Sequence, residues 1–170
     1  GPDPLPAHAG SLSAAFTAMV DFPEAGLWGA ELQVTTGEQT YKDLRLTFAV
    51  QEQTAEPSVG DEVPRTRQPI VQDGGDLADL DSSSTPHRSL HDLTVADAIA
   101  SGKPTVVAFV TPAFCQTRFC GPVLNSVVLP VQRQYESRAN VIHIEPYDLP
   151  AARTGTLNKA PAAVEWNLRA

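Results

Sequence analysis

The two cysteines of this chain, Cys115 and Cys120, lie between an apolar run and a segment with helical periodicity. Residues 105–110 form an almost uninterrupted apolar run, which is typical of a strand covered on both faces of a parallel sheet. Residues 122–138 place their apolar side chains on one helical face, and a second apolar run follows at 141–145. Strand, helix and strand in this order predict a parallel pair joined by a right-handed crossover. This part of the chain is thereby constrained to an α/β fold.

Capping residues predict a short helix ahead of the first strand. Thr94 is a favourable N-cap residue, and Asp97 three residues later approximates a capping box. Gly102 is suited to end that helix. The longer helix after the cysteines contains Pro130, which is expected to kink it because proline removes a backbone donor. One further helical turn is expected near residues 164–168.

Residues 9–53 have the pattern of β structure. Apolar and polar side chains alternate over residues 28–35 and 44–50, which is the period of half-buried strands. The intervening residues 36–39 include a glycine suited to a turn, so we expect a hairpin. A third strand is expected within residues 11–20. Three strands make a poor independent core, so we expect an immunoglobulin-like β-sandwich segment or packing against the rest of the chain.

Residues 54–88 are rich in Pro, Asp, Ser and Gly and lack a sustained apolar period. This composition predicts a linker or an ordered arm that wraps against the rest of the chain. Four aspartates within it resemble calcium ligands in type: Asp73, Asp76, Asp79 and Asp81. Their spacing lacks the Gly and Glu positions of the helix-loop-helix calcium site, so we expect a solvated acidic loop instead.

The cysteine region carries a family resemblance. Residues 120–122, Cys-Gly-Pro, match three positions of the Cys-Gly-Pro-Cys redox motif, and residues 113–115, Ala-Phe-Cys, resemble its aromatic-Cys beginning. Residues 89–170 therefore resemble the thioredoxin-like domains of secreted or lipid-anchored bacterial proteins. The Cys-x4-Cys spacing, with Val123 where the second cysteine would be, departs from that family's Cys-x2-Cys. The resemblance implies a thioredoxin-like domain that stops before the family's cis-proline, preceded by the end of a β domain over residues 9–53.

Three roles of Cys115 and Cys120 are open. The pair can form a static disulfide, which needs a non-helical loop because five residues of a regular helix turn about 500°. It can exchange with protein thiols and disulfides, as the resemblance implies, with Cys115 preferred as nucleophile because it follows the strand. Helix-start backbone N–H groups and Arg118 would favour a thiolate. It can also bind Cu(I), as copper chaperones of this superfamily do with Cys-x3-Cys and a distal histidine.

The histidines have structural interpretations. His143 alternates with apolar neighbours in the second predicted strand, which favours a hydrogen-bonded core residue over a ligand or base. Under strand alternation it shares a face with Glu145, so a His–Glu hydrogen bond is predicted. His87 and His91 flank a loop and a helix start, and we expect them at the surface.

Composition narrows the function classes. Twenty acidic against 12 basic side chains give a net charge of -8, which argues against nucleic-acid binding. No apolar run approaches the roughly 20 residues of a membrane span, and no cofactor or zinc-type motif is present. The resemblance and the single cysteine pair imply an extracytoplasmic location. We expect a thiol–disulfide exchange protein or, alternatively, a non-catalytic binding module or subunit of a cell-envelope assembly.

Overall fold

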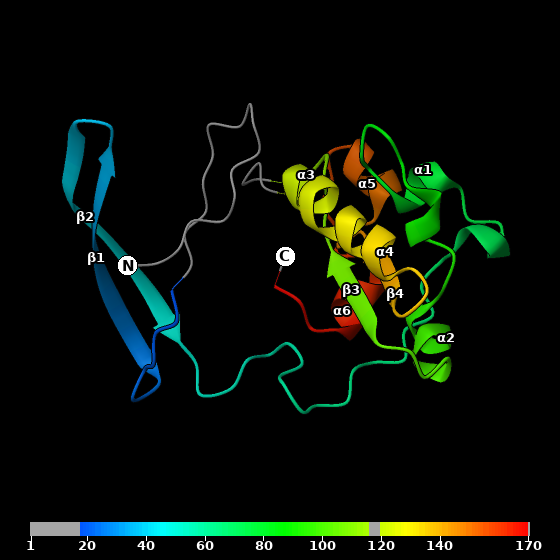
Figure 1. The fold of residues 1–170 in the computed structure, drawn as a ribbon, viewed down its shortest axis with the longest axis horizontal. Helices are drawn as coiled ribbons and strands as arrows, with labels where there is room; N and C mark the ends of the chain where they lie inside the picture. The colour runs from blue at the N-terminus through cyan, green and yellow to red at the C-terminus, as the bar shows by residue number, and fades with distance from the viewer. Residues whose placement is uncertain (1–17, 116–119, 170) are drawn as a thin grey trace. The chain divides into compact units, whose positions relative to one another are not determined.

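The computed structural model describes residues 18–115 and 120–169 and contains both helices and strands (Figure 1). The chain forms two compact units, Gly1–Thr54 and Ala55–Ala170. The coarse prediction of a mixed α and β protein is confirmed.

The first unit contains a β-hairpin. Strand β1, Gly26–Thr36, pairs antiparallel with strand β2, Gln39–Val50. Gly37 in the turn has φ 58°, a left-handed conformation that glycine adopts without steric cost. Trp28 lies opposite Phe48, so the alternating apolar side chains of both strands share one face. The predicted hairpin is confirmed.

The hairpin leaves much of its apolar surface exposed. Its exposed large apolar side chains are Leu27, Leu32, Val34, Tyr41, Leu44 and Leu46. Of the third strand predicted within residues 11–20, residues 11–17 lie outside the described residues, and residues 18–20 are not in a strand. The described part of this unit has a two-stranded sheet, so an immunoglobulin-like sandwich stays a prediction.

The second unit contains a parallel strand pair joined by a helical segment. Strand β3, Thr105–Phe109, pairs with strand β4, Asn140–Ile144. The connection is helical from α3, Cys120–Val123, through the π-helical segment η3, Leu124–Val128, to α4, Leu129–Tyr135. The predicted parallel pairing is confirmed. It brings the carboxyl ends of both strands to the same edge of the sheet.

The π-helical segment lies just before Pro130. Leu129 donates its backbone N–H to the carbonyl of Leu124, five residues earlier. Pro130 has no N–H and cannot form the α-helical hydrogen bond to Ser126. The departure from α geometry is therefore in the turn that precedes the proline, and π-bulges are a known source of helix bending.

Apolar cores form on both faces of the strands. On the face of the α3–α4 segment the buried residues are Leu90, Val110, Leu124, Val128, Leu129 and Val141. On the opposite face they are Val95, Ala98, Ile142, Ile144 and Ala162. Helix α2, Val95–Ala100, supplies part of the second core and is capped by Thr94, whose side chain accepts from the N–H of Asp97. The predicted cap is confirmed.

Short helices complete this unit: η1 Val71–Asp73, α1 Leu77–Leu80, η2 Arg88–Leu90, α5 Leu149–Arg153 and α6 Pro161–Glu165. The last of these is the helical turn predicted near residues 164–168, and it lies about three residues earlier. The helix begins earlier than predicted because Pro161 is in its first turn, where the fixed φ of proline suits the start of a helix.

Residues of the Pro- and Asp-rich stretch pack against this α/β unit. The Thr66 hydroxyl donates to Oε2 of Glu165 over 2.6 Å and accepts from Nε1 of Trp166 over 2.7 Å. The Trp166 ring packs beside Phe109, with the ring centroids 5.2 Å apart. Through these contacts the Pro- and Asp-rich stretch packs against α6 and, through Trp166, against β3.

Candidate functional site

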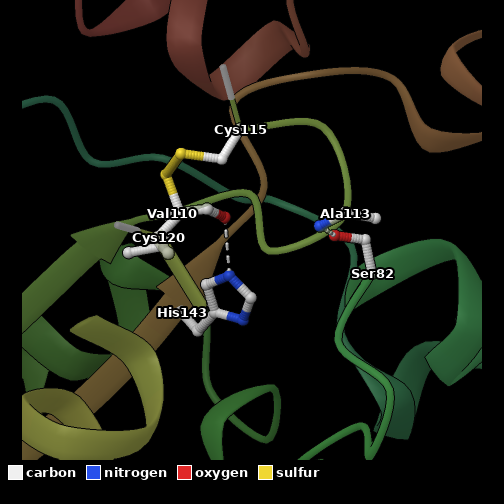
Figure 2. Close-up of a disulfide and its surroundings, with 6 residues drawn as sticks. All are labelled: Ser82, Val110, Ala113, Cys115, Cys120 and His143. Carbon is white, nitrogen blue, oxygen red and sulfur yellow. Dashed lines mark hydrogen bonds between the residues drawn. A yellow bond between two sulfur atoms is a disulfide. The ribbon is translucent and has the colours of Figure 1, made fainter. Parts of the chain in front are cut away.

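A disulfide joins Cys115 and Cys120 in the loop between β3 and α3 (Figure 2). Their Cα atoms lie 6.0 Å apart, inside the usual range for this bond. Cys115 lies in the loop, and Cys120 is the first residue of α3. Arg118, predicted to favour a thiolate here, lies outside the described residues. The structure thus brings the two predicted site residues together after the carboxyl end of a parallel strand, where α/β sheets commonly place their sites.

The two cysteines have different surroundings. Both are partly buried, but Cys120 also packs against the core that contains Leu124. The loop before Cys115 is held by a contact with the Pro- and Asp-rich stretch, because Ala113 donates its backbone N–H to the Ser82 hydroxyl over 3.0 Å (Figure 2). The sulfur of Cys115 therefore belongs to the loop, and the sulfur of Cys120 belongs to the helix that packs against the core.

His143 on β4 points its ring toward the end of β3. Its Nε2 lies 2.8 Å from the backbone carbonyl oxygen of Val110 (Figure 2). Because a carbonyl oxygen only accepts, Nε2 donates this hydrogen bond. Burial lowers the pKa of His143 to about 4, so the ring is neutral at pH 7 and Nδ1 carries a lone pair. The prediction of a hydrogen-bonded core histidine is confirmed.

The predicted hydrogen bond between His143 and Glu145 is wrong. Nε2 of His143 lies 4.0 Å from Oε1 of Glu145, beyond hydrogen-bond distance. Glu145 instead accepts the backbone N–H of Ser82 over 2.8 Å. Burial raises the pKa of Glu145, and the Ser82 hydrogen bond offsets part of that effect.

His91 is buried, which corrects the expectation of a surface residue. It follows the short helix η2 and is 3% exposed. Its ring meets that of His143 edge to face, with the ring centroids 5.1 Å apart. No local pattern predicts this contact, because His91 and His143 are 52 positions apart and meet only through tertiary packing. His87, also expected at the surface, is half-buried.

Asp81 is also buried, at 2% exposed, and this corrects the expectation of a solvated loop for that residue. Its Oδ1 accepts from the backbone N–H of Ser83 over 2.9 Å, and its Oδ2 from that of His87 over 2.8 Å. Burial by itself would raise the pKa of Asp81, but His91 and these hydrogen bonds outweigh it and hold the pKa well below its usual range. Asp81 is therefore a buried carboxylate at neutral pH.

Asp81, His91 and His143 form a buried cluster, named here the Asp–His cluster. Oδ2 of Asp81 lies 3.6 Å from Nε2 of His91 and 4.0 Å from Nδ1 of His143. One nitrogen or oxygen of each of the three residues lies within 4.8 Å of the others. No sequence pattern predicts this cluster, because Asp81 stands among acidic neighbours that are exposed, such as Asp79.

A cavity of about 540 Å³ opens beside the cluster. His91, His143 and Glu145 line it together with Thr66, Tyr147 and Glu165. Neither Cys115 nor Cys120 is among the described residues that line it. His143 therefore connects two features: its Nε2 is hydrogen-bonded to Val110 before the disulfide loop, and the residue is among those that line the cavity.

No family model, curated protein or solved structure matches the chain. Within the described residues, no helix combines the length and apolar character that crossing a bilayer requires.

Proposed function

We propose that this chain is a thioredoxin-like protein that exchanges disulfides with client proteins through Cys115 and Cys120. The observation that supports this proposal is the position of the disulfide, between the carboxyl end of β3 and the first residue of α3. The resemblance of residues 113–115 and 120–122 to a redox motif supports it independently.

The exchange follows ordinary thiol chemistry. In the reduced chain, a thiolate attacks one sulfur of a client disulfide, the client S–S bond breaks, and one client sulfur leaves as a thiolate. The second cysteine of the chain then attacks the mixed disulfide, forms the Cys115–Cys120 bond and releases the other client thiolate. Two electrons pass to the client, and the reverse sequence oxidises a client dithiol.

Cys115 is the proposed attacking residue, and Cys120 the resolving residue. Cys115 lies in a loop, whereas Cys120 packs against the apolar core at the start of the helix. A client sulfur must approach the attacking thiol closely, which favours the loop position. After that attack, Cys120 needs only the movement that re-forms the disulfide seen in the structure.

The proposed compartment is extracytoplasmic. Both cysteines of the chain are in one disulfide, and stable disulfides are favoured in oxidising compartments. Protein thiols and disulfides in that compartment are the proposed partners. An immunoglobulin-like character of the hairpin unit belongs to the same proposal, on the strength of its alternating antiparallel strands.

The direct test is to measure the reduction potential of the pair together with insulin-reducing activity. A redox protein is expected to turn over insulin and to have a potential above about -300 mV. A lower potential without turnover would support the alternative, a non-catalytic binding module or envelope subunit with a static disulfide. Stoichiometric Cu(I) binding by the reduced chain, lost in Cys115→Ser, would support the copper alternative.

Single-cysteine variants test the assignment of roles. Cys120→Ser keeps the proposed attacking thiol, and Cys115→Ser keeps the proposed resolving thiol. Cys120→Ser is expected to react faster with an aromatic disulfide reagent and to accumulate a mixed disulfide with a client. Faster reaction of Cys115→Ser would reverse the two roles.

A further inference from the structure

We propose that the Asp–His cluster binds a divalent transition-metal ion, with Asp81, His91 and His143 as its protein ligands. Two imidazoles and one carboxylate form a ligand set of both Zn²⁺ and Fe²⁺ sites, and Zn²⁺ is the ion used in the test below. The proposal is independent of the thiol–disulfide exchange proposed above, because it uses neither cysteine.

The strongest observation is a pair of buried nitrogens without hydrogen-bond partners. Nδ1 of His143 and Nε2 of His91 are both in this state, and both lie near Oδ2 of Asp81. Buried polar atoms are normally paired, because leaving them unpaired costs about 1–3 kcal/mol each. A proton on Nε2 of His91 would satisfy that residue alone and would leave Nδ1 of His143 unpaired. One cation between the three side chains satisfies all of them.

The tautomer of His143 is already the one that a metal requires. Its Nε2–H donates a hydrogen bond to the carbonyl of Val110. The lone pair is therefore on Nδ1, which faces Asp81. Metal-binding histidines usually donate their other ring N–H to a carbonyl or a carboxylate, and this contact fixes the ring. Asp81 is oriented in the same way by the N–H groups of Ser83 and His87.

The distances are compatible with modest side-chain movement. Zn²⁺ bonds its nitrogen and oxygen ligands at about 2.0–2.2 Å, so neighbouring ligand atoms of a tetrahedral site lie about 3.3–3.5 Å apart. The two contacts of Asp81 Oδ2 are 3.6 Å and 4.0 Å, and the whole set lies within 4.8 Å. The widest pair must contract by up to about 1.4 Å to reach that spacing, and side-chain rotation supplies this movement.

The ligand chemistry selects the metal class. Two imidazoles and one carboxylate suit Zn²⁺ and similar ions, whereas Ca²⁺ and Mg²⁺ require mainly oxygen ligands. Cu(I) favours soft thiolates, and the cysteines are tied to each other in a disulfide.

The cluster lies against the cavity, because His91 and His143 are among the residues that line it. The ligand atoms themselves are buried: Nδ1 of His143 and Nε2 of His91 have almost no exposed surface, and the side chains of Asp81 and His143 are fully buried. Three protein ligands with an open fourth position are typical of catalytic zinc sites, whereas structural sites are closed by four. Glu145 lines the same cavity with an unpaired buried oxygen, Oε2.

Calorimetric titration with Zn²⁺ tests the proposal on the full chain, treated with chelator and kept oxidised so that no thiol is free. We expect one ion per chain for the wild type. Loss of an outer hydrogen-bond partner typically weakens metal binding about 10–100-fold, so loss of a ligand in His91→Gln or Asp81→Asn should weaken it about 100-fold or more. Asp73→Asn, at an exposed aspartate of the same acidic stretch, is the matched control for Asp81→Asn and should bind as the wild type does. The proposal is overturned by a wild type without stoichiometric binding, by His91→Gln that binds normally, or by equal loss in Asp73→Asn.

A spectroscopic readout on the unmutated chain guards against variants that fail to fold. Zn²⁺ should shift the imidazole ¹⁵N resonances of His143 Nδ1 and His91 Nε2, while the Nε2–H of His143 persists. Co²⁺ should give the intense visible absorption of a four-coordinate site. Shifts confined to His87 or His8 would overturn the assignment.

Discussion

The Nε2–H of His143 donates a 2.8 Å hydrogen bond to the carbonyl of Val110, immediately after β3. This contact joins the end of one parallel strand to a side chain of its neighbour. It also links the loop that carries Cys115 with the Asp–His cluster, since the other nitrogen of the same ring faces Asp81. The hydrogen bond therefore fixes both the ring tautomer and the path of the chain as it leaves the sheet.

Removal of this donor should destabilise the second unit. His143→Leu leaves the carbonyl of Val110, a residue only 7% exposed, without its partner. A lost partner of this kind costs about 1–3 kcal/mol. Urea unfolding of chelator-treated protein measures the effect, with His143→Gln as the control because its amide N–H can replace part of the bond. Equal stability of the Leu variant and the wild type would contradict the prediction.

The metal-free protein should lose stability as the pH falls from about 7 to about 4. Burial lowers the pKa of His143 to about 4 from 6.5, so in this window the unfolded chain binds the proton more readily than the folded chain. The contribution of the neutral His143 to the free energy of unfolding is complete above pH 6.5. It is lost as the pH falls through the pKa of the folded state, and the total loss is about 3 kcal/mol. The other titratable groups around the ring are Asp81, His87, His91 and Glu145.

Urea unfolding of chelator-treated wild type and His143→Gln across this pH range isolates the effect. Glu145 has a raised pKa and therefore acts with the opposite sign, but it is present in both proteins and largely cancels from the difference. The wild type should lose its advantage over the variant toward pH 4. Parallel pH profiles would show that another group is responsible.

Sequence patterns predicted the elements whose residues repeat locally. The alternation in residues 28–35 and 44–50 gave the hairpin, and the apolar runs gave β3 and β4 to within one residue of their ends. The Thr94 cap gave α2. In each case the pattern that predicts the element lies within a few residues, because strand alternation and helix capping depend on side chains that are close together in the sequence.

The Asp–His cluster carries no such local signal. Asp81 stands among exposed aspartates, and its burial depends on contacts with His87 and His91 across a loop without periodicity. His143 was predicted to be a core histidine, but its facing residues could not be read from the chain. Five-residue helices such as Leu149–Arg153 were missed for a related reason, since one turn is too short for a helical pattern.

The Thr66 hydroxyl should contribute measurably to the stability of the second unit. Thr66→Val keeps the shape of the side chain but removes a donor to Glu165 and an acceptor for Trp166. Because Thr66 is buried, the expected loss is about 1–3 kcal/mol in the free energy of unfolding. Thr47→Val on exposed β2 is the control and should change little. A neutral Thr66→Val would mean that the bond is not formed in solution.

The disulfide should stabilise the folded second unit. It closes a short loop, with a sequence separation of 5, and chain-entropy arguments assign about 2 kcal/mol to a loop of this size. Urea unfolding of oxidised and reduced wild type should differ by about that amount. The Cys115→Ser, Cys120→Ser double variant should match the reduced form and be insensitive to reductant. A reduced form more stable than the oxidised form would instead indicate a strongly oxidising pair.

Metal occupancy of the Asp–His cluster should appear as stability. Binding to the folded state alone adds about 2.7 kcal/mol when the free ion is at 100 times its dissociation constant, so Zn²⁺ should raise the melting temperature of chelator-treated wild type. A chelator should reverse the shift, and Asp73→Asn, at an exposed aspartate, should behave like the wild type. His91→Gln should respond little, because it keeps only two of the three ligands, Asp81 and His143. An equal Zn²⁺ shift in His91→Gln would mean that the ion binds elsewhere on this acidic chain.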